Sequence, residues 1–266
     1  MHPERILPQR EPSAAVRVVA AIPARYASSR LPGKMLRPLA GRPLIEHVYR
    51  RAAEAPALSR VVVLTDDERI AEAVRAFGGD VEMTPGDCVS GTDRIAWAAR
   101  SWEADAVVNV QGDEPLIAPA LIGALARHLA THPEDAMVTA AAPASTEDLD
   151  DENVVKVVAD RMGYALYFSR APIPYRRHPE GAPLRRHVGV YGYQLACLLR
   201  LAELAPSPLE RAESLEQLRA LENGIPIRVL EATEAPPGVD TIEDLERVEA
   251  LLRERPAKST RNGGSV

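Results

Sequence analysis

The first residues that could do chemistry lie in one basic loop. Between positions 25 and 42 the chain carries five cations and no acidic residue, namely Arg25, Arg30, Lys34, Arg37 and Arg42. Guanidinium and ammonium groups at this density suit the oxygens of a triphosphate, and Gly33 lets the backbone approach a ligand closely. The loop has neither P-loop nor dinucleotide-fingerprint spacing. The alternative is a basic loop that only contacts solvent. Phosphate binding is favoured because the loop directly follows an apolar strand pattern.

Two aspartates are candidate metal ligands. Asp113 follows an apolar run in VVNVQGDEP, and Asp240 stands in PGVDTIEDL. Mg²⁺ prefers one or two carboxylates together with substrate oxygens and water, so the pair could hold magnesium against phosphates. The alternatives are an ordinary turn aspartate before Pro115 and, for Asp240 or Thr241, a cap on the last helix.

A second group of cations lies in the later half. Positions 170–187 hold five arginines against the single acid Glu180, namely Arg170, Arg176, Arg177, Arg185 and Arg186. A guanidinium is the natural partner of a carboxylate ligand. His187 and Tyr191 are four residues apart in a strand pattern, which puts them on one face, although a lone histidine is more often structural. Glu216 and Gln217 stand in a helical pattern, where a solvent-facing pair is the alternative.

Alternating strand and helix patterns must position these residues. They predict an α/β fold with a mainly parallel sheet flanked by helices. In the first half the predicted strands are Arg17–Ile22, Arg60–Thr65 and Asp105–Gln111, and the predicted helices are Pro43–Ala55, Asp67–Phe77, Thr92–Trp102 (capped by Thr92 or Asp93) and Pro119–His132.

The second half has a different texture. Its predicted strands are Val154–Val158, Tyr164–Ser169, His187–Tyr193 and Ile225–Glu231, and its predicted helices are Leu209–Asn223 and Thr241–Arg253. The short strands predict a smaller, partly antiparallel inserted lobe at about 143–223. The rest of a single domain over 16–255 comprises about 16–142 and 224–255. Residues 1–15 are predicted to form a flexible extension and 256–266 a flexible tail.

Composition narrows the class of protein. Apolar residues make up 46% and charged residues 26% of the 266 residues, the usual balance of a globular protein, and the net charge is −6. An acidic chain predicts neither nucleic acid nor a membrane as partner. Cys88 and Cys197 match no metal or redox spacing, and we expect both to be packing residues. With no secretion signal or membrane span, the predicted location is the cytoplasm.

Ordered motifs resemble one family over most of the chain, from Arg17 to Leu252. The motifs are IPARYASSRLPGK, SGTDR, NVQGDEP, VVKVV, YFSRAPIPY, HVGVYGY, LEQLR and GVDTIEDLERV. In this order they resemble the 3-deoxy-manno-octulosonate (Kdo) cytidylyltransferases; the SRLPGK loop alone also occurs in CMP-sialic acid synthetases. The resemblance implies a nucleotide-diphospho-sugar transferase-like fold. It also implies a magnesium-dependent homodimer that converts CTP and Kdo to CMP-Kdo and pyrophosphate for lipopolysaccharide biosynthesis.

The resemblance also implies residue roles. The CTP-binding positions are Pro23, Ala24, Arg25, Arg30, Lys34, Ser90, Gly91, Thr92 and Arg94. The Kdo-binding positions are Gln111, Arg170, His187, Tyr191, Glu216 and Gln217. Asp113 and Asp240 match the magnesium ligands and count with Arg25 and Lys34 as catalytic. The lobe at 143–223 would bind the sugar and form the dimer, and the rest would bind CTP and metal. Cys88 departs from the pattern, because a histidine is common there in the family.

Two other functions remain open at this stage. Another cytidylyltransferase, acting on sialic acid or on an amino-substituted Kdo, would use the same loop and carboxylates. A catalytically silent binding module could also keep this fold. The joint presence of Lys34, Asp113 and Asp240 favours an enzyme.

Overall fold

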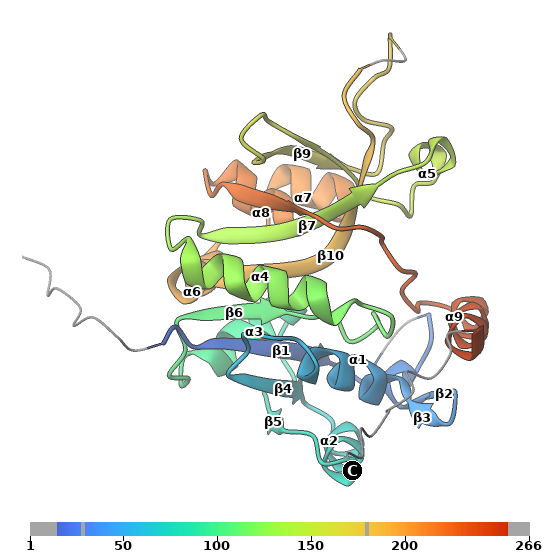
Figure 1. Cartoon of the computed structure of the whole chain (residues 1–266). Helices are drawn as coiled ribbons and strands as arrows, with labels where there is room; N and C mark the ends of the chain where they lie inside the picture. The colour runs from blue at the N-terminus through green and yellow to red at the C-terminus, as the bar shows by residue number, and fades with distance from the viewer. Residues whose placement is uncertain (1–14, 28–29, 179–180, 255–266) are drawn as a thin grey trace, which may run out of the picture.

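A large sheet forms the centre of the molecule, and helices cover both of its faces (Figure 1). The computed structural model describes residues 15–27, 30–178 and 181–254. The main strand order is β11-β7-β10-β6-β1-β4-β5, and β8 and β9 extend it beside β10. Their bounds are β1 Val18–Ala24, β4 Arg60–Thr65, β5 Val81–Met83, β6 Ala106–Asn109, β7 Met137–Pro143, β8 Lys156–Ala159, β9 Ala165–Ser169, β10 Arg185–Gln194 and β11 Ile227–Glu231.

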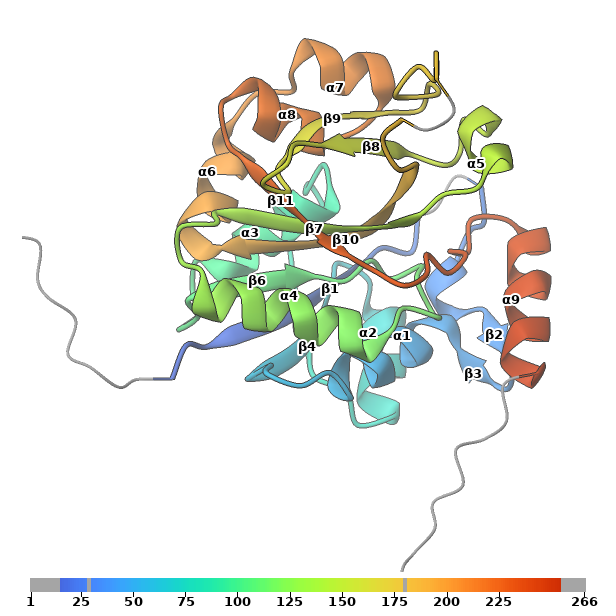
Figure 2. The same cartoon turned by 45° about the horizontal axis from the view of Figure 1, so that its top comes forward.

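The helices form two layers around the sheet (Figure 2). They are α1 Leu44–Ala53, α2 Glu68–Ala76, α3 Gly91–Ala99, α4 Pro119–Thr131, α5 Thr146–Asp150, α6 Leu195–Glu203, α7 Pro208–Glu213, α8 Gln217–Glu222 and α9 Ile242–Glu254. A short hairpin, β2 (Pro38–Leu39) and β3 (Arg42–Pro43), precedes α1. Helices α1, α2, α4 and α9 pack on one face, and α3, α6 and α8 on the other. No helix of the described ranges is long and apolar enough to cross a bilayer.

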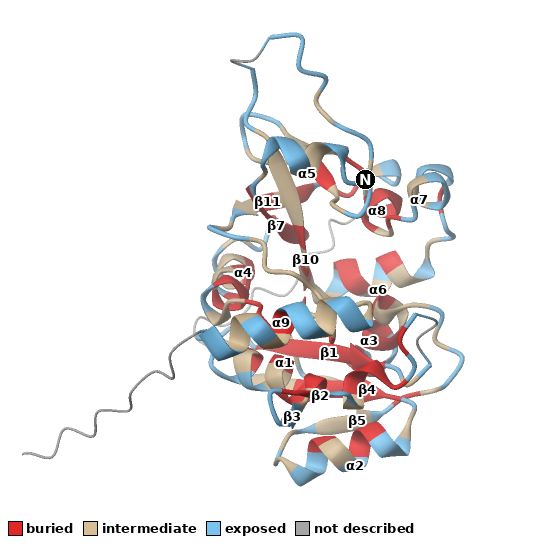
Figure 3. Ribbon diagram, turned by 90° about the vertical axis from the view of Figure 1, so that its right-hand side faces the viewer, coloured by how far each residue is buried: buried red, intermediate tan, exposed pale blue. Residues whose placement is uncertain are grey.

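Strand direction explains which residues meet at the working edge of the sheet. β6, β1, β4 and β5 run parallel, as do β7 and β11. The central strands β1 and β6 are buried along their whole length, as parallel strands under two helix layers must be, and Figure 3 shows β1 as buried. The edge strand β5 is only partly buried. β10 runs antiparallel between β6 and β7. Its first residues therefore lie at the same edge as the last residues of β1 and β6.

The α/β fold and the elements of the first half are confirmed, apart from one helix cap. Ser90, and neither Thr92 nor Asp93, caps α3: its Oγ accepts a hydrogen bond from the Asp93 N–H, and the Asp93 carboxylate accepts one from the Ser90 N–H. The sequence patterns missed β5, β7 and α6. The strand expected over His187–Tyr193 is the longer β10, which lies within the main sheet.

The predicted helix over Leu209–Asn223 is wrong. Two short helices, α7 and α8, occupy this range, with Ser214 between them in the left-handed conformation at φ 53°. Glu213, the last residue of α7, accepts hydrogen bonds from Ser169 Oγ and the Arg170 N–H. The break therefore lets α7 hold the end of β9 while α8 turns toward the sheet.

A charged cluster around Asp135 lies just before β7, at the edge of the sheet opposite the carboxyl ends of β1 and β6. The buried Asp135 accepts hydrogen bonds from Tyr164 OH (2.6 Å) and Arg228 Nε (3.2 Å), and His128 Nε2 lies 2.6 Å from its Oδ2. Burial by itself raises the pKa of Asp135, but the hydrogen bonds from Tyr164 and His128 and the charge of Arg228 outweigh it and lower the pKa. One carboxylate thus joins α4, the β8–β9 hairpin and β11.

We expect Asp135→Ala to lower the free energy of unfolding by about 3 kcal/mol or more, because it leaves buried donors without their acceptor. Glu134→Ala, an exposed neighbour, should change it by less than about 0.5 kcal/mol. Urea denaturation of both variants measures the difference. Equal effects would show that the cluster adds nothing.

The same carboxylate predicts a pH dependence of stability. Its pKa is lower in the folded than in the unfolded state, so its contribution is present above the unfolded pKa and is lost as the pH falls through the folded pKa. Between about pH 5 and 2, wild-type stability should therefore fall more steeply than that of Asp135→Asn. If the free energy of unfolding fell equally steeply with pH in the two proteins, this prediction would be contradicted.

Candidate active site

A cavity of about 360 Å³ opens at the carboxyl ends of β1 and β6. Its lining comprises Pro23, Ala24, Arg25, Arg30, Lys34, Met35, Cys88, Val89, Ser90, Gly91, Arg94, Gln111, Gly112, Asp113 and Asp240. Every expected CTP-binding residue except Thr92 lines it. Thr92 lies buried behind the wall, with its hydroxyl donating to Glu216 (3.0 Å). The structure therefore gathers the basic loop, the SGTDR segment and both aspartates around one space.

Two glycines bring the walls of this cavity close together. Gly33 has a φ of 68°, which favours glycine, and its N–H donates to Tyr26 O (3.1 Å), so the chain turns back before Lys34. A Cβ on Gly112 would lie 3.1 Å from Pro23 O and 3.0 Å from Met35 Sδ. Only a residue without a side chain fits there without movement, which accounts for the glycine in QGDEP.

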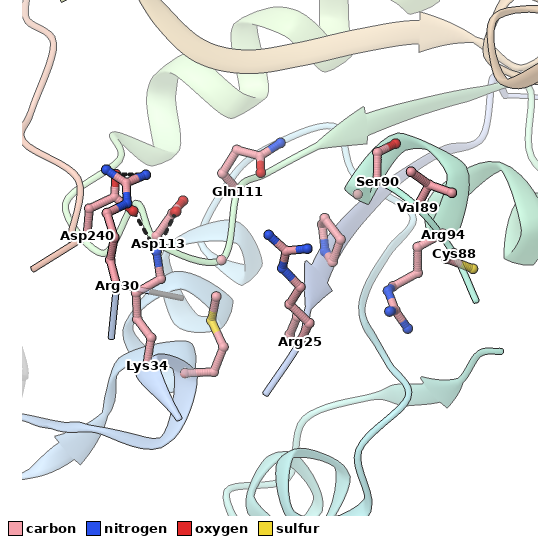
Figure 4. A pocket seen from close by; sticks show the side chains of 15 residues that line it. Arg25, Arg30, Lys34, Cys88, Val89, Ser90, Arg94, Gln111, Asp113 and Asp240 are labelled. Atoms are coloured by element: carbon pink, nitrogen blue, oxygen red, sulfur yellow. Dashed lines mark hydrogen bonds and ion pairs between the residues drawn. The ribbon is translucent and has the colours of Figure 1, made fainter. Parts of the chain in front are cut away.

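The ammonium group of Lys34 joins the two aspartates (Figure 4). Its Nζ lies 2.8 Å from Asp113 Oδ2 and 3.0 Å from Asp240 Oδ1, and Arg30 pairs with Asp240 Oδ2 at 3.1 Å. The Lys34 side chain is 7% exposed. Burial lowers its pKa, but the charges and hydrogen bonds of Asp113 and Asp240 outweigh burial and raise it. Lys34 is therefore a charged cation held between two carboxylates.

Thr241 caps α9, which leaves Asp240 available to the cavity. Thr241 Oγ1 accepts from the Asp244 N–H (3.2 Å), and Asp244 Oδ2 accepts from the N–H groups of Asp240 and Thr241. The Asp240 side chain instead faces Lys34 and Arg30. The N–H of Val239 donates to Asp113 O (2.9 Å), which fixes this segment beside Asp113.

The donor set suits magnesium. Asp113 and Asp240 come from separate segments, already share one cation, and are about a third exposed or more (34% and 43%). Mg²⁺ takes one or two carboxylates and fills its remaining positions with water and substrate oxygens. No group of three or more potential metal-ligating side chains occurs within the described ranges. The candidate ligands are these two carboxylates, because they already share a cation beside the cavity.

The far end of the cavity is formed by the start of α3 (Figure 4). Gly91 packs against Pro23, since a Cβ there would lie 3.1 Å from Pro23 Cγ. Arg94 is buried, pairs with Asp66 at 3.3 Å and donates to Thr84 Oγ1. Cys88 lines the cavity, and burial raises its thiol pKa. The expectation that both cysteines only pack the interior therefore holds for the buried Cys197 and is wrong for Cys88.

Glu216 connects the nucleotide side to the expected sugar side. Its carboxylate accepts hydrogen bonds from Ser90 Oγ (3.2 Å) and Thr92 Oγ1 (3.0 Å). Burial raises its pKa, opposed by those hydrogen bonds. Gln217 is buried, and its Nε2 has no hydrogen-bond partner. The solvent-facing alternative for this pair is therefore wrong. Gln111 lines the cavity and donates to Asn109 Oδ1 (3.0 Å).

His187 and Tyr191 share a face, as strand alternation predicted. Their ring centroids lie 5.2 Å apart, and His187 makes an edge contact with Phe168. His187 Nε2 lies 2.9 Å from Thr139 Oγ1. Burial lowers the pKa of His187 to about 3, so the ring is neutral, and burial also raises the pKa of Tyr191. Both residues are suited to neutral hydrogen bonding.

Arg170 does not line this cavity. Its Nε donates to Glu213 O and its NH1 donates to Glu152 O, each at 2.9 Å. Lys156, which is fully buried, donates to the carbonyls of Asp151, Val154 and Arg170. In this conformation the guanidinium of Arg170 supports the loop that precedes β8.

A second cavity of about 580 Å³ shares Asp113 and Asp240 with the first. It is also lined by Glu114, Arg186, His187 and Gly189. Burial and the charge of Asp113 raise the pKa of Glu114 to about 8. Glu114 Oε2 and Arg186 Nε are buried without hydrogen-bond partners. Neither residue was among the predicted site residues, although Glu114 adjoins Asp113 and Arg186 belongs to the second group of cations.

Known proteins resemble the chain along most of its length. The family model described as Cytidylyltransferase matches residues 19–232. A 3-deoxy-manno-octulosonate cytidylyltransferase of Syntrophotalea carbinolica is 52% identical over 246 residues, covering 89% of this chain and 98% of that protein. The corresponding protein of Geobacter sulfurreducens is 50% identical over 248 residues, covering 89% and 99%.

Solved structures agree with these relatives. A CMP:2-keto-3-deoxy-manno-octonic acid synthetase complexed with CTP has a TM-score of 0.87 and 45% identity, covering 89% of this chain and 98% of the other. A 4-diphosphocytidyl-2C-methyl-D-erythritol synthase of Anaerococcus prevotii has a TM-score of 0.61 at 13% identity, covering 90% and 97%. The latter likeness shows the fold alone.

The geometry around Asp240 separates a capping role from a binding role. Thr241→Ala should lower the free energy of unfolding by about 1 kcal/mol through loss of the cap and leave divalent-cation binding intact. Asp240→Asn should keep the cap and weaken cation binding at least tenfold. Thermal unfolding and calorimetric Mg²⁺ titration of both variants test this. Cation binding lost in Thr241→Ala but kept in Asp240→Asn would reverse the assignment.

Proposed function

This chain belongs to the cytidylyltransferase family, among the 3-deoxy-manno-octulosonate cytidylyltransferases, and from that membership we propose that it transfers CMP from CTP to the anomeric hydroxyl of Kdo. The products are CMP-Kdo and pyrophosphate. One observation carries the proposal: a single cavity gathers Arg25, Arg30 and Lys34 opposite the carboxylates Asp113 and Asp240. CMP-Kdo is the sugar donor for lipopolysaccharide biosynthesis, and we place the enzyme there.

The reaction requires positioning more than covalent chemistry. The Kdo hydroxyl attacks the α-phosphorus of CTP and expels pyrophosphate, so no enzyme nucleophile is needed. Asp113 and Asp240 would hold magnesium, which would supply positive charge beside the phosphate that is transferred. Arg25, Arg30 and Lys34 neutralise the charge that develops on the leaving pyrophosphate.

The cytidine end is assigned to the start of α3. Ser90 and Gly91 lie at the far end of the cavity from Lys34, so the triphosphate lies over the cations and the pyrimidine ring over the SGTDR segment. Gly91 packs on Pro23, and we assign the preference for a pyrimidine over a purine to this wall. Discrimination between CTP and UTP must come from hydrogen bonds, because the two bases have nearly the same shape.

The sugar side is assigned to Gln111, Arg170, His187, Tyr191, Glu216 and Gln217. Support comes from Gln111 in the cavity wall and from Glu216, whose hydrogen bonds to Ser90 and Thr92 put this side next to the nucleotide. The neutral His187 and Tyr191 suit hydroxyl groups. The Kdo carboxylate is assigned to Arg170, which must leave its carbonyl partners to reach it.

A homodimer in the cytoplasm completes the proposal. Large apolar side chains are exposed on the lobe at 143–223, namely Met162 (70%), Leu166 (63%) and Tyr175 (89%). Contact between two such lobes would remove them from water, and each fully buried side chain contributes about 1.5–3 kcal/mol. Both cysteines are free, which suits a reducing compartment.

A pyrophosphate-release assay over a panel of nucleotides and acidic sugars tests the function. With Kdo and Mg²⁺ we expect CTP to react fastest, UTP much more slowly, and ATP and GTP not at all. Kdo should be preferred over sialic acid and over amino-substituted Kdo. Asp113→Asn serves as the inactive control and should lower kcat at least a hundredfold, because a full charge leaves the metal site. Equal use of ATP would refute the assignment.

Two arginines provide a matched test of the carboxylate assignment. Arg170→Ala should raise KM for Kdo at least tenfold and leave CTP affinity unchanged, because truncating one partner of a bound charge pair costs about 2–5 kcal/mol. Arg186→Ala removes the same group from the wall of the second cavity and should have the smaller effect. Steady-state kinetics in Kdo compare the two. A larger effect in Arg186→Ala would move the Kdo carboxylate to the second cavity.

A further inference from the structure

Lys34 occupies the position that a divalent cation needs. Its ammonium group lies within 3.0 Å of one oxygen of each aspartate, whereas Mg²⁺ binds carboxylate oxygens at about 2.0–2.1 Å. A cation drawn that close to both oxygens leaves no room for Nζ between them. Lys34 and a divalent cation that bound these same two oxygens, Asp113 Oδ2 and Asp240 Oδ1, would therefore exclude each other.

We infer that Lys34 is an exchangeable internal counter-ion, which holds Asp113 and Asp240 together without a metal and is released toward the nucleotide phosphates when a divalent cation binds. The inference rests on the proposed metal site and adds a second role for Lys34. Under this inference, the ammonium charge of Lys34 becomes available to phosphates only when a divalent cation occupies Asp113 and Asp240.

Charge and burial support this exchange. Two carboxylates so close together repel each other unless a cation lies between them, and Lys34 is the buried cation that meets this need. Its side chain is 7% exposed, whereas that of Arg30, which pairs with Asp240, is 64% exposed. Lys34 also lines the nucleotide cavity. When a divalent cation binds the two carboxylates, the ammonium group can therefore turn to the nucleotide phosphates in the same cavity.

The exchange lowers the apparent affinity for metal in the free protein. When a ligand must displace a bound group, its apparent Kd equals its intrinsic Kd divided by the fraction of protein molecules in which the site is free. Removing the Lys34 charge should therefore tighten metal binding while it weakens nucleotide binding. A lysine that only contacts phosphate would leave metal affinity in the nucleotide-free protein unchanged.

The first test is Mn²⁺ titration of the nucleotide-free protein, with free Mn²⁺ counted by electron paramagnetic resonance. Lys34→Met should lower the Kd for Mn²⁺ at least tenfold, or 1.4 kcal/mol. Arg37→Met is the matched control, because it removes one exposed charge from the same loop, and should change Kd less than twofold. An unchanged or higher Kd in Lys34→Met overturns the exchange.

Aspartate variants separate this inference from the metal site itself. Asp113→Asn and Asp240→Asn should each weaken Mn²⁺ binding strongly. If they do and Lys34→Met does not tighten it, the metal site stands and the exchange fails. If neither aspartate variant weakens binding, the proposed metal site fails and the inference fails with it.

A second test uses the unaltered protein, so it does not depend on the folding of a variant. The chain has three lysines, Lys34, Lys156 and Lys258; Lys156 is fully buried on three carbonyl oxygens, and Lys258 lies outside the described residues. Brief acetylation followed by peptide mass spectrometry should show at least a threefold rise at Lys34 when Mn²⁺ is added, and none at Lys156. A Lys34 signal that stays constant or falls refutes the release.

Discussion

One ammonium group joins three segments that are far apart in the sequence. Lys34 follows β1, Asp113 follows β6 and Asp240 precedes α9. β1 and β6 are parallel neighbours, so the residues that follow them emerge at one edge of the sheet, where open α/β sheets bind ligands. Such ion pairs contribute little net stability once desolvation is counted. The value of this bridge is positional, because it holds Lys34, Asp113 and Asp240 together at one edge of the sheet.

β10 brings the sugar-side residues to the same edge. Because it runs antiparallel between β6 and β7, its early residue His187 lies where β1 and β6 end. The register shifts between Val188 and Tyr191, which adds two unpaired residues to β10. An even number of extra residues preserves the alternation of faces, so His187 and Tyr191 still meet at 5.2 Å. The reversed strand thus brings His187 and Tyr191 to the edge of the sheet where β1 and β6 end.

Local periodicity and ordered motifs in the sequence predicted many of the strands and helices of the first half and the residues around the cavity. β1, α1, β4, α2, α3 and β6 follow from it, whereas the short strands β2, β3 and β5 do not. The basic loop and both aspartates, which the motifs singled out, line one cavity. β7 was missed because its alanines have weak strand propensity, and only its pairing with β10 and β11 makes it a strand. The break at Ser214 and the contact of Glu216 with Ser90 depend on residues more than forty positions away. No local pattern records such contacts.

The unsatisfied polar atoms of the described ranges point to the acceptor. Buried side-chain atoms without hydrogen-bond partners there are Glu114 Oε2, Arg186 Nε and Gln217 Nε2. Each such atom costs about 1–3 kcal/mol, so a folded chain keeps few of them. Glu114 and Arg186 line the cavity that shares both aspartates with the nucleotide cavity, and Gln217 follows the glutamate that binds Ser90. The open acceptor of Glu114 and the open donor of Arg186 would suit a hydroxyl-bearing ligand in this second cavity, and a site of this kind rejects analogues that lack the hydroxyl groups. Selectivity for such a ligand would then have a physical basis separate from the cations of the first cavity.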